Sequence, residues 1–299
     1  MLDLKEIKKN NRINMKHIKH YKIFESTSPN FPSTKEGVIQ VCKKYKIKNY
    51  TINNDLSIDV DGNVIIGYTL LEYLPLRFNH VSGYFDCSGN RLKSLEGSPQ
   101  TLDSGFYCTN NNLESLKGCP QTISDSFICY FNELKSLEGG PQTVNGSFDC
   151  SNNKLESLEG CTQTVSGSFY CYKNELKSLE GCPQTISGDF YCFDNNLVSL
   201  EGCPHTINGD FMCSDNKLTD LEHFPNVEGH INIAENKVHY LVYTFINKAD
   251  SFMIEDFTDY EIVRNGNTVM LDRLQTFIRD NGLEMPNLEE IKKHYKIIE

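Results

Sequence analysis

The 299-residue chain is 38% hydrophobic and 23% charged, a composition typical of a folded protein rather than a disordered one. No segment approaches the ~20 consecutive apolar residues that a membrane helix needs, so we expect no membrane partner. The basic N-terminus lacks the apolar core and cleavage site of a secretion signal. We therefore place the protein in a cytoplasm, either that of a bacterium or that of an infected host cell.

The net charge of −11 is unevenly distributed along the chain. Residues 1–50 contain 12 Lys or Arg and 4 Asp or Glu, a balance of +8, so the remainder carries −11 − 8 = −19. A body this acidic is repelled by phosphate backbones, and we do not expect nucleic acid as the main partner.

Residues 1–63 are predicted to form a basic segment followed by a small cap. Residues 1–14 carry no strong structural signal, and Met15 is an alternative start of translation. Ser33-Thr34 is an N-cap signal for a helix over about 34–46, and the alternating residues 50–60 indicate a β-hairpin. We expect the two to cover the open end of the segment that begins near residue 64, because an exposed strand edge invites pairing with another chain.

Residues 64–238 contain an internal repeat of 21 residues. Phe begins each of seven copies, at 85, 106, 127, 148, 169, 190 and 211. Cys follows two residues later, Asn three after that, and then two Leu, as in Cys87, Asn90, Leu92 and Leu95. A Gly and a Pro close most copies, with Thr162 replacing the Pro in one of them.

Each column of the repeat has a physical role. Phe-x-Cys alternates inward and outward residues and predicts a short strand, and stacked strands would build one continuous core. The Asn amide can bond backbone groups of neighbouring turns and form a ladder. The Gly is predicted at a positive φ, and the Pro stiffens the return segment.

These columns resemble the leucine-rich-repeat template L-x-x-L-x-L-x-x-N-x-L, with Phe and Cys at the apolar strand positions. Atypical copies at Val64–Leu74 and Ile231–Val238 are what terminal repeats look like. The short, Pro-containing unit is similar to the bacterial class of these repeats, and the Cys-rich copies are similar to uncharacterised bacteriophage repeat proteins. The resemblance implies an α/β-type solenoid with short parallel strands on its concave face, acting as a binding scaffold.

Residues 239–299 depart from the repeat and are predicted to form a helical C-terminal cap. A periodic stretch from Val269 to Ile278 indicates one helix that Gly282 ends, and Asn287 begins a second helix.

Twelve cysteines raise the alternative of a metal or redox role. A single Cys on every strand is not the paired spacing of zinc sites, and disulfides are not expected in a cytoplasm. We interpret the Cys column as core packing and expect no metal and no cofactor. No nucleophile motif and no phosphate-binding Gly loop is present, so we predict that the protein is not an enzyme.

The outward strand positions are where the copies disagree. They carry two aromatic groups, which are costly to expose unless a partner covers them. The predicted partner-binding residues are Tyr107, Tyr130 and Phe131 in one group, and Tyr170, Tyr172, Tyr191, Phe193 and Met212 in the other. We expect them to bind a protein partner, a host or viral factor. Carbohydrate stacking with Asp149 and Asp194 as acceptors is the alternative, and packing between strands would explain the rings without any ligand.

Overall fold

The computed structural model describes residues 30–238, 245, 260, 262–264 and 268–299 of the chain. The proposed start at Met15 and most of the apolar stretch after Val238 lie outside the described residues. Within them, no helix has the length and apolarity to cross a membrane.

The N-terminal part contains the predicted helix and hairpin. Helix α2 (Lys35–Lys44) begins after Thr34, whose hydroxyl accepts a hydrogen bond from the Gly37 N–H at 3.1 Å. Strands β1 (Tyr50–Ile52) and β2 (Ile58–Val60) pair antiparallel, and β2 then pairs in parallel with β4 (Phe78–Val81). The helix buries Val38 and Cys42 in the same hydrophobic core as the repeats. Both elements are confirmed, while their role as a cap stays a prediction.

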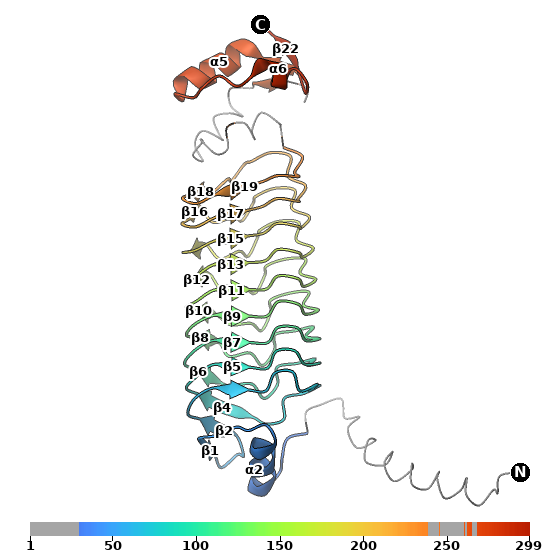
Figure 1. Ribbon diagram of the computed structural model, residues 1–299, viewed down its shortest axis with the longest axis vertical. Helices are drawn as coiled ribbons and strands as arrows, with labels where there is room; N and C mark the ends of the chain where they lie inside the picture. Colours follow the sequence, from blue (N-terminus) through green and yellow to red (C-terminus); the bar gives the residue numbers. More distant parts are fainter. Residues whose placement is uncertain (1–29, 239–244, 246–259, 261, 265–267) are drawn as a thin grey trace, which may run out of the picture.

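Residues 64–232 wind into a solenoid in which each turn takes about 21 residues (Figure 1). The Phe-x-Cys segments form a nine-stranded parallel sheet in which the Phe of each turn lies beside the Phe of the next. Its strands are β3 (Val64–Ile65), β5 (Phe85–Asp86), β7 (Phe106–Tyr107), β9 (Phe127–Ile128), β11 (Phe148–Asp149), β13 (Phe169–Tyr170), β15 (Phe190–Tyr191), β17 (Phe211–Met212) and β19 (Ile231–Asn232). The predicted solenoid with parallel strands is confirmed.

The return segment of each turn forms a second parallel sheet, which the sequence did not predict. Its strands are only two residues long, and all but the last consist of an outward Thr followed by an inward Ile or Val, as in Thr143–Val144. Strands β8 (Thr122–Ile123), β10 (Thr143–Val144), β12 (Thr164–Val165), β14 (Thr185–Ile186), β16 (Thr206–Ile207) and β18 (Asn226–Val227) make up this sheet, while β6 (Thr101–Leu102) joins β1, β2 and β4. The core therefore lies between two sheets.

The predicted Asn ladder is present and links every turn to its neighbour. Asn111 Nδ2 donates to the carbonyls of Cys87 in the preceding turn and Cys108 in its own turn, both at 3.1 Å. Its Oδ1 accepts from the Leu92 N–H at 3.0 Å. The same bonds recur through the solenoid, so these buried amides satisfy backbone groups that no strand pairing reaches.

The repeated glycine has the predicted backbone conformation. Gly160 has φ of +86°, and an added Cβ would lie 2.8 Å from the Glu138 nitrogen of the preceding turn. Only glycine fits there, because both the backbone angle and the close approach exclude a side chain.

The described C-terminal residues form a small α+β unit with its own core rather than helices alone. Helices α5 (Leu271–Asp280) and α6 (Leu288–Ile291) match the prediction. They are joined by a mixed sheet of β20 (Val263–Arg264), β21 (Thr268–Met270) and β22 (Lys296–Ile298). Strand β21 runs directly into α5, so the apolar periodicity beginning at Val269 includes a strand as well as the helix. Whether this unit caps the solenoid stays a prediction.

Candidate partner-binding face

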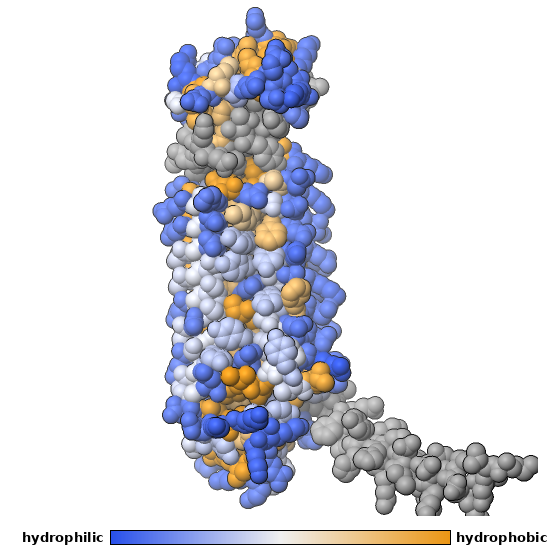
Figure 2. All heavy atoms as spheres, viewed as in Figure 1, coloured by the Kyte–Doolittle hydropathy of each residue, from blue (hydrophilic) through white to orange (hydrophobic). Residues whose placement is uncertain are grey.

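The outward side of the nine-stranded sheet consists of three columns of residues. In each turn the residues before and after the Cys point away from the core, because side chains alternate along a strand. The residue that precedes each Asn forms the third column. We call these three columns, from Asp86 to Asp215, the outward face. Figure 2 shows pale and orange residues running along one face of the solenoid between hydrophilic flanks.

The third column has a left-handed backbone in every turn. Its φ angles lie between +52° and +54° at Asn110, Phe131, Asn152, Lys173, Asp194 and Asp215. Asn and Asp tolerate this conformation, whereas other side chains pay roughly 1–2 kcal/mol for it. Phe131 adopts it with 55% of its surface exposed, so the ring gains little burial in return.

The second predicted aromatic group forms a continuous cluster. Tyr172 and Phe193 stack with ring centroids 4.5 Å apart and an angle of 7° between their planes. Tyr170 and Tyr191 lie 5.0 Å apart, and Tyr191 reaches Phe193 at 6.4 Å. Met212 is the register neighbour of Tyr191. All five side chains are half-buried, so a rigid sheet presents them to solvent as one surface.

The first predicted group is only partly brought together. Tyr130 and Phe131 contact each other edge to face, with centroids 5.5 Å apart. Tyr107 instead packs against Tyr84, with centroids 5.9 Å apart, and its ring lies over Gly105. Tyr84 precedes the Phe of its turn and was not among the predicted residues.

Asp149 and Ser151 separate the two groups. Asp149 Oδ1 accepts from the Ser151 N–H at 2.9 Å and from its hydroxyl at 2.6 Å. Burial raises the pKa of Asp149 above its usual value, although these two hydrogen bonds oppose the shift. No residue in the described part of the chain donates to its other oxygen, which reaches solvent. A half-buried carboxylate with one oxygen free of protein donors thus lies in the turn between the two aromatic groups.

Similarity to known proteins is found among solved structures. No protein-family model and no curated protein matches the chain. Among solved structures it is similar to YopM from Yersinia enterocolitica WA-314, with a TM-score of 0.41 and 17% sequence identity. The match covers 75% of this chain and 56% of YopM, so the chain spans just over half of that protein.

The cysteines have the properties of packing residues. Burial raises the pKa of thiols such as Cys129 and Cys150, which keeps them protonated, whereas the thiolate is the nucleophile and the metal ligand. Across the described ranges, no three His, Cys, Asp or Glu side chains converge as a metal-binding group.

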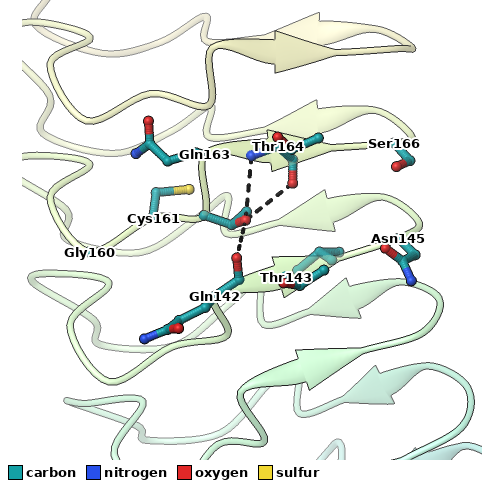
Figure 3. Close-up of a pocket in the computed structure, with 10 residues that line it drawn as sticks. Gln142, Thr143, Asn145, Gly160, Cys161, Gln163, Thr164 and Ser166 are labelled. Carbon is teal, nitrogen blue, oxygen red and sulfur yellow. Dashed lines mark hydrogen bonds between the residues drawn. The ribbon is translucent and has the colours of Figure 1, made fainter.

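A hollow of about 480 Å³ lies on the second sheet, between two neighbouring turns (Figure 3). One departure from the repeat lies there, because Thr162 replaces the Pro of the other turns, and the adjacent Cys161 is partly exposed. The Thr162 hydroxyl donates to the Gln142 carbonyl at 2.7 Å, which satisfies both groups. The lining contains amides, hydroxyls and the Cys161 thiol, and no Asp, Glu, His, Lys or Arg is among its residues.

Two further features of the solenoid surface were missed by sequence reasoning. A second ladder runs along the residues that precede Phe148, Phe169, Phe190 and Phe211, where for example the Ser147 N–H donates to Ser126 Oγ and the Asp210 N–H donates to Asp189 Oδ1. Its signal was the recurring Ser or Asp at that position. At the first turn, Tyr68 is 79% exposed and Leu70 is 66% exposed. Both residues have a left-handed backbone, which no sequence pattern predicts.

Proposed function

We propose that the protein is a non-enzymatic protein-interaction module, encoded by a bacterium or bacteriophage and acting in a bacterial or infected-host cytoplasm. The observation that carries the proposal is the cluster of Tyr170, Tyr172, Tyr191 and Phe193, four connected rings half-exposed on a rigid sheet. Tyr residues held in this way lose little conformational entropy on binding and are frequent anchors of protein interfaces.

The test is capture of a partner by tagged wild-type protein and by the Tyr172→Ala/Phe193→Ala double variant, using lysate of the native host and mass spectrometry. The stacking contact contributes about 0.5–1.5 kcal/mol, so the double variant is expected to stay folded. Circular dichroism checks this. Tyr68→Ala, which removes an exposed ring outside the cluster, is the matched control. Capture by wild type and control that is lost in the double variant supports the proposal. Equal capture by all three refutes the use of this face.

Carbohydrate recognition by the same face is the second candidate. Tyr172 and Phe193 each use one ring face for their mutual stacking, while the neighbouring positions in the column are the small Ser151 and Ser214. The outer ring faces can therefore accept a sugar, with Asp149 and Asp194 as hydrogen-bond acceptors. A glycan array probed with wild-type protein and the double variant separates the two candidates. Binding to a defined glycan that the double variant loses would favour the sugar.

A further inference from the structure

Aspartates stand on both sides of the second aromatic group. In the turn of β15, Asp189 precedes Phe190 and points outward like Tyr191, because side chains alternate along a strand. Asp194 lies at the other end of the same row, directly after Phe193. The turn of β17 has an Asp at both of these positions as well. We call these four residues the acidic rim: Asp189, Asp194, Asp210 and Asp215.

The charges of the rim reach the rings, and few positive charges compensate them. The pKa of Tyr191 is raised, first by burial and then by the charges of Asp189 and Asp210. The outward face carries one basic residue, Lys173. His230 of the last turn lies 3.3 Å from the carboxylate of Asp210. With four Asp against one Lys, this part of the surface is complementary to a positively charged partner.

The fold does not need the charges of the rim. Asp189 Oδ1 accepts from the Asp210 N–H at 3.0 Å, but Ser126 Oγ accepts the equivalent bond in an earlier turn. Asp194 has a φ of +54°, and Asn152 has a φ of +52° at the same position two turns earlier. A neutral residue thus serves each structural role elsewhere in the solenoid. Asp residues in adjacent turns instead stand about one strand spacing apart, roughly 4.8 Å, where like charges oppose folding.

The first aromatic group has no such rim. The positions that correspond to the rim are uncharged in the turns of β7, β9 and β11, where they are occupied by Gly105, Ser126, Ser147, Asn110, Phe131 and Asn152. The charges at the two ends of the row therefore distinguish the second aromatic group from the first.

We propose that the second aromatic group and the acidic rim bind a basic segment of the partner protein, with an apolar side chain on the rings and Lys or Arg on both sides of it. The rings would bury the apolar residue, while the carboxylates pair with the cations. An extended segment matches the row, because Asp189 and Asp194 are five residues apart, or up to about 16 Å, and basic residues four or five positions apart span a similar distance. The inference rests on the proposed function, since it assumes that this face binds a protein.

The rim can be neutralised by changes that preserve its structural roles. Asn keeps the Oδ1 acceptor that Asp189 and Asp210 provide, and it tolerates the left-handed backbone of Asp194 and Asp215. The rim variant carries all four Asp→Asn changes. The matched control carries four Glu→Gln changes at exposed corners before the second sheet, outside the outward face: Glu159, Glu180, Glu201 and Glu222. Both variants change the net charge equally, and circular dichroism checks that both are folded.

The experiment measures binding of three dye-labelled 12-residue Gly/Ser peptides to the full-length protein by fluorescence anisotropy. The first peptide carries a Phe with two Arg on each side. Gln replaces every Arg in the second peptide, and Gly replaces the Phe in the third. Wild type and the Glu→Gln control are expected to bind the first peptide about tenfold more tightly than either of the others, a factor that two surface ion pairs or one buried ring can supply. The rim variant is expected to bind the first two peptides about equally.

Four outcomes overturn the inference. If the rim variant and the Glu→Gln control weaken binding equally, attraction to the acidic protein as a whole explains it. Equal binding of the Arg and Gln peptides to wild type, equal binding of the Phe and Gly peptides, and no measurable binding of the first peptide are the others. Failure here is distinguishable from failure of the proposed function. If the rim variant still captures the native partner while Tyr172→Ala/Phe193→Ala does not, the face binds a protein without using the rim.

Discussion

Replacing Asn153 with Ala removes one rung of the side-chain ladder from the middle of the solenoid. Asn153 Oδ1 is the acceptor for the buried Leu134 N–H at 3.0 Å, and its Nδ2 donates to the carbonyls of Cys129, Cys150 and Ser151. Each Cys carbonyl keeps a second donor from another rung of the ladder. The Leu134 N–H would keep no acceptor in the described structure, because the backbone hydrogen bonds of the strands do not include it.

The magnitude can be worked out from these partners. A buried N–H left without an acceptor costs about 1–3 kcal/mol, and each of the other hydrogen bonds lost with the Asn153 amide costs about 0.5–1 kcal/mol. We therefore expect Asn153→Ala to lower the free energy of unfolding by about 3–5 kcal/mol, a large share of the total stability of a typical domain. Urea unfolding followed by circular dichroism measures the loss.

Two controls separate the ladder from general effects of substitution. Asn236→Ala removes the last rung, where the residue is partly exposed and water can replace the amide, so the expected loss is about 1 kcal/mol. Asn152→Gly changes the adjacent Asn while preserving its positive φ, and is expected to stay within about 0.5 kcal/mol of wild type. A loss below about 1 kcal/mol for Asn153→Ala, or one equal to that of Asn236→Ala, would refute the reasoning.

Three further changes test backbone, thiol and charge. Gly160→Ala is expected to lower the free energy of unfolding by about 2 kcal/mol, because the residue has a positive φ and its new Cβ would contact the preceding turn. Gly62→Ala should cost less, because no atom lies within 4 Å of its new Cβ. In the folded protein at pH 8, a thiol reagent should react slowly, and first at the partly exposed Cys161. In urea all 12 thiols should react. Fast reaction of several thiols in the folded state would contradict the packing role. Asp149→Asn is expected to raise the melting temperature at pH 7. Since the folded-state pKa of Asp149 is raised, ionisation favours the unfolded chain, and the gain should fade as the pH falls below the usual Asp value; a gain that persists at pH 3 would be inconsistent with this cause.

The repeat columns were predictable because each serves one chemical need that recurs seven times. Phe and Cys fill the core, and Asn satisfies backbone groups that only an amide can bridge. The second sheet was not predictable from periodicity, because a two-residue Thr-Val strand gives no alternation to recognise. Its strands form because in-register stacking of the turns brings equivalent segments together.

The composition of the candidate face was predictable, but its contacts were not. The outward positions were identified because the copies differ there. Which rings meet depends on side-chain rotamers, so Tyr107 contacts Tyr84 rather than Tyr130. The left-handed backbone of the third column was not predicted, because its residues differ widely, from Gly89 to Phe131. The neighbouring turns impose this backbone geometry.

The two sheets differ in how uniform their outward residues are. The second sheet presents an exposed Thr in five consecutive turns, the uniformity expected where only strand formation matters. The first sheet has the same repeat and the same strand spacing, so stability alone would favour similar uniformity there. Instead it places an exposed Phe131 at positive φ and a half-buried Asp149 carboxylate within two consecutive turns. Both features oppose folding, because one strains the backbone and the other desolvates a charge. We infer that these two turns serve binding, because strained and desolvated groups are often kept at functional sites, and this is the function that we propose for the face.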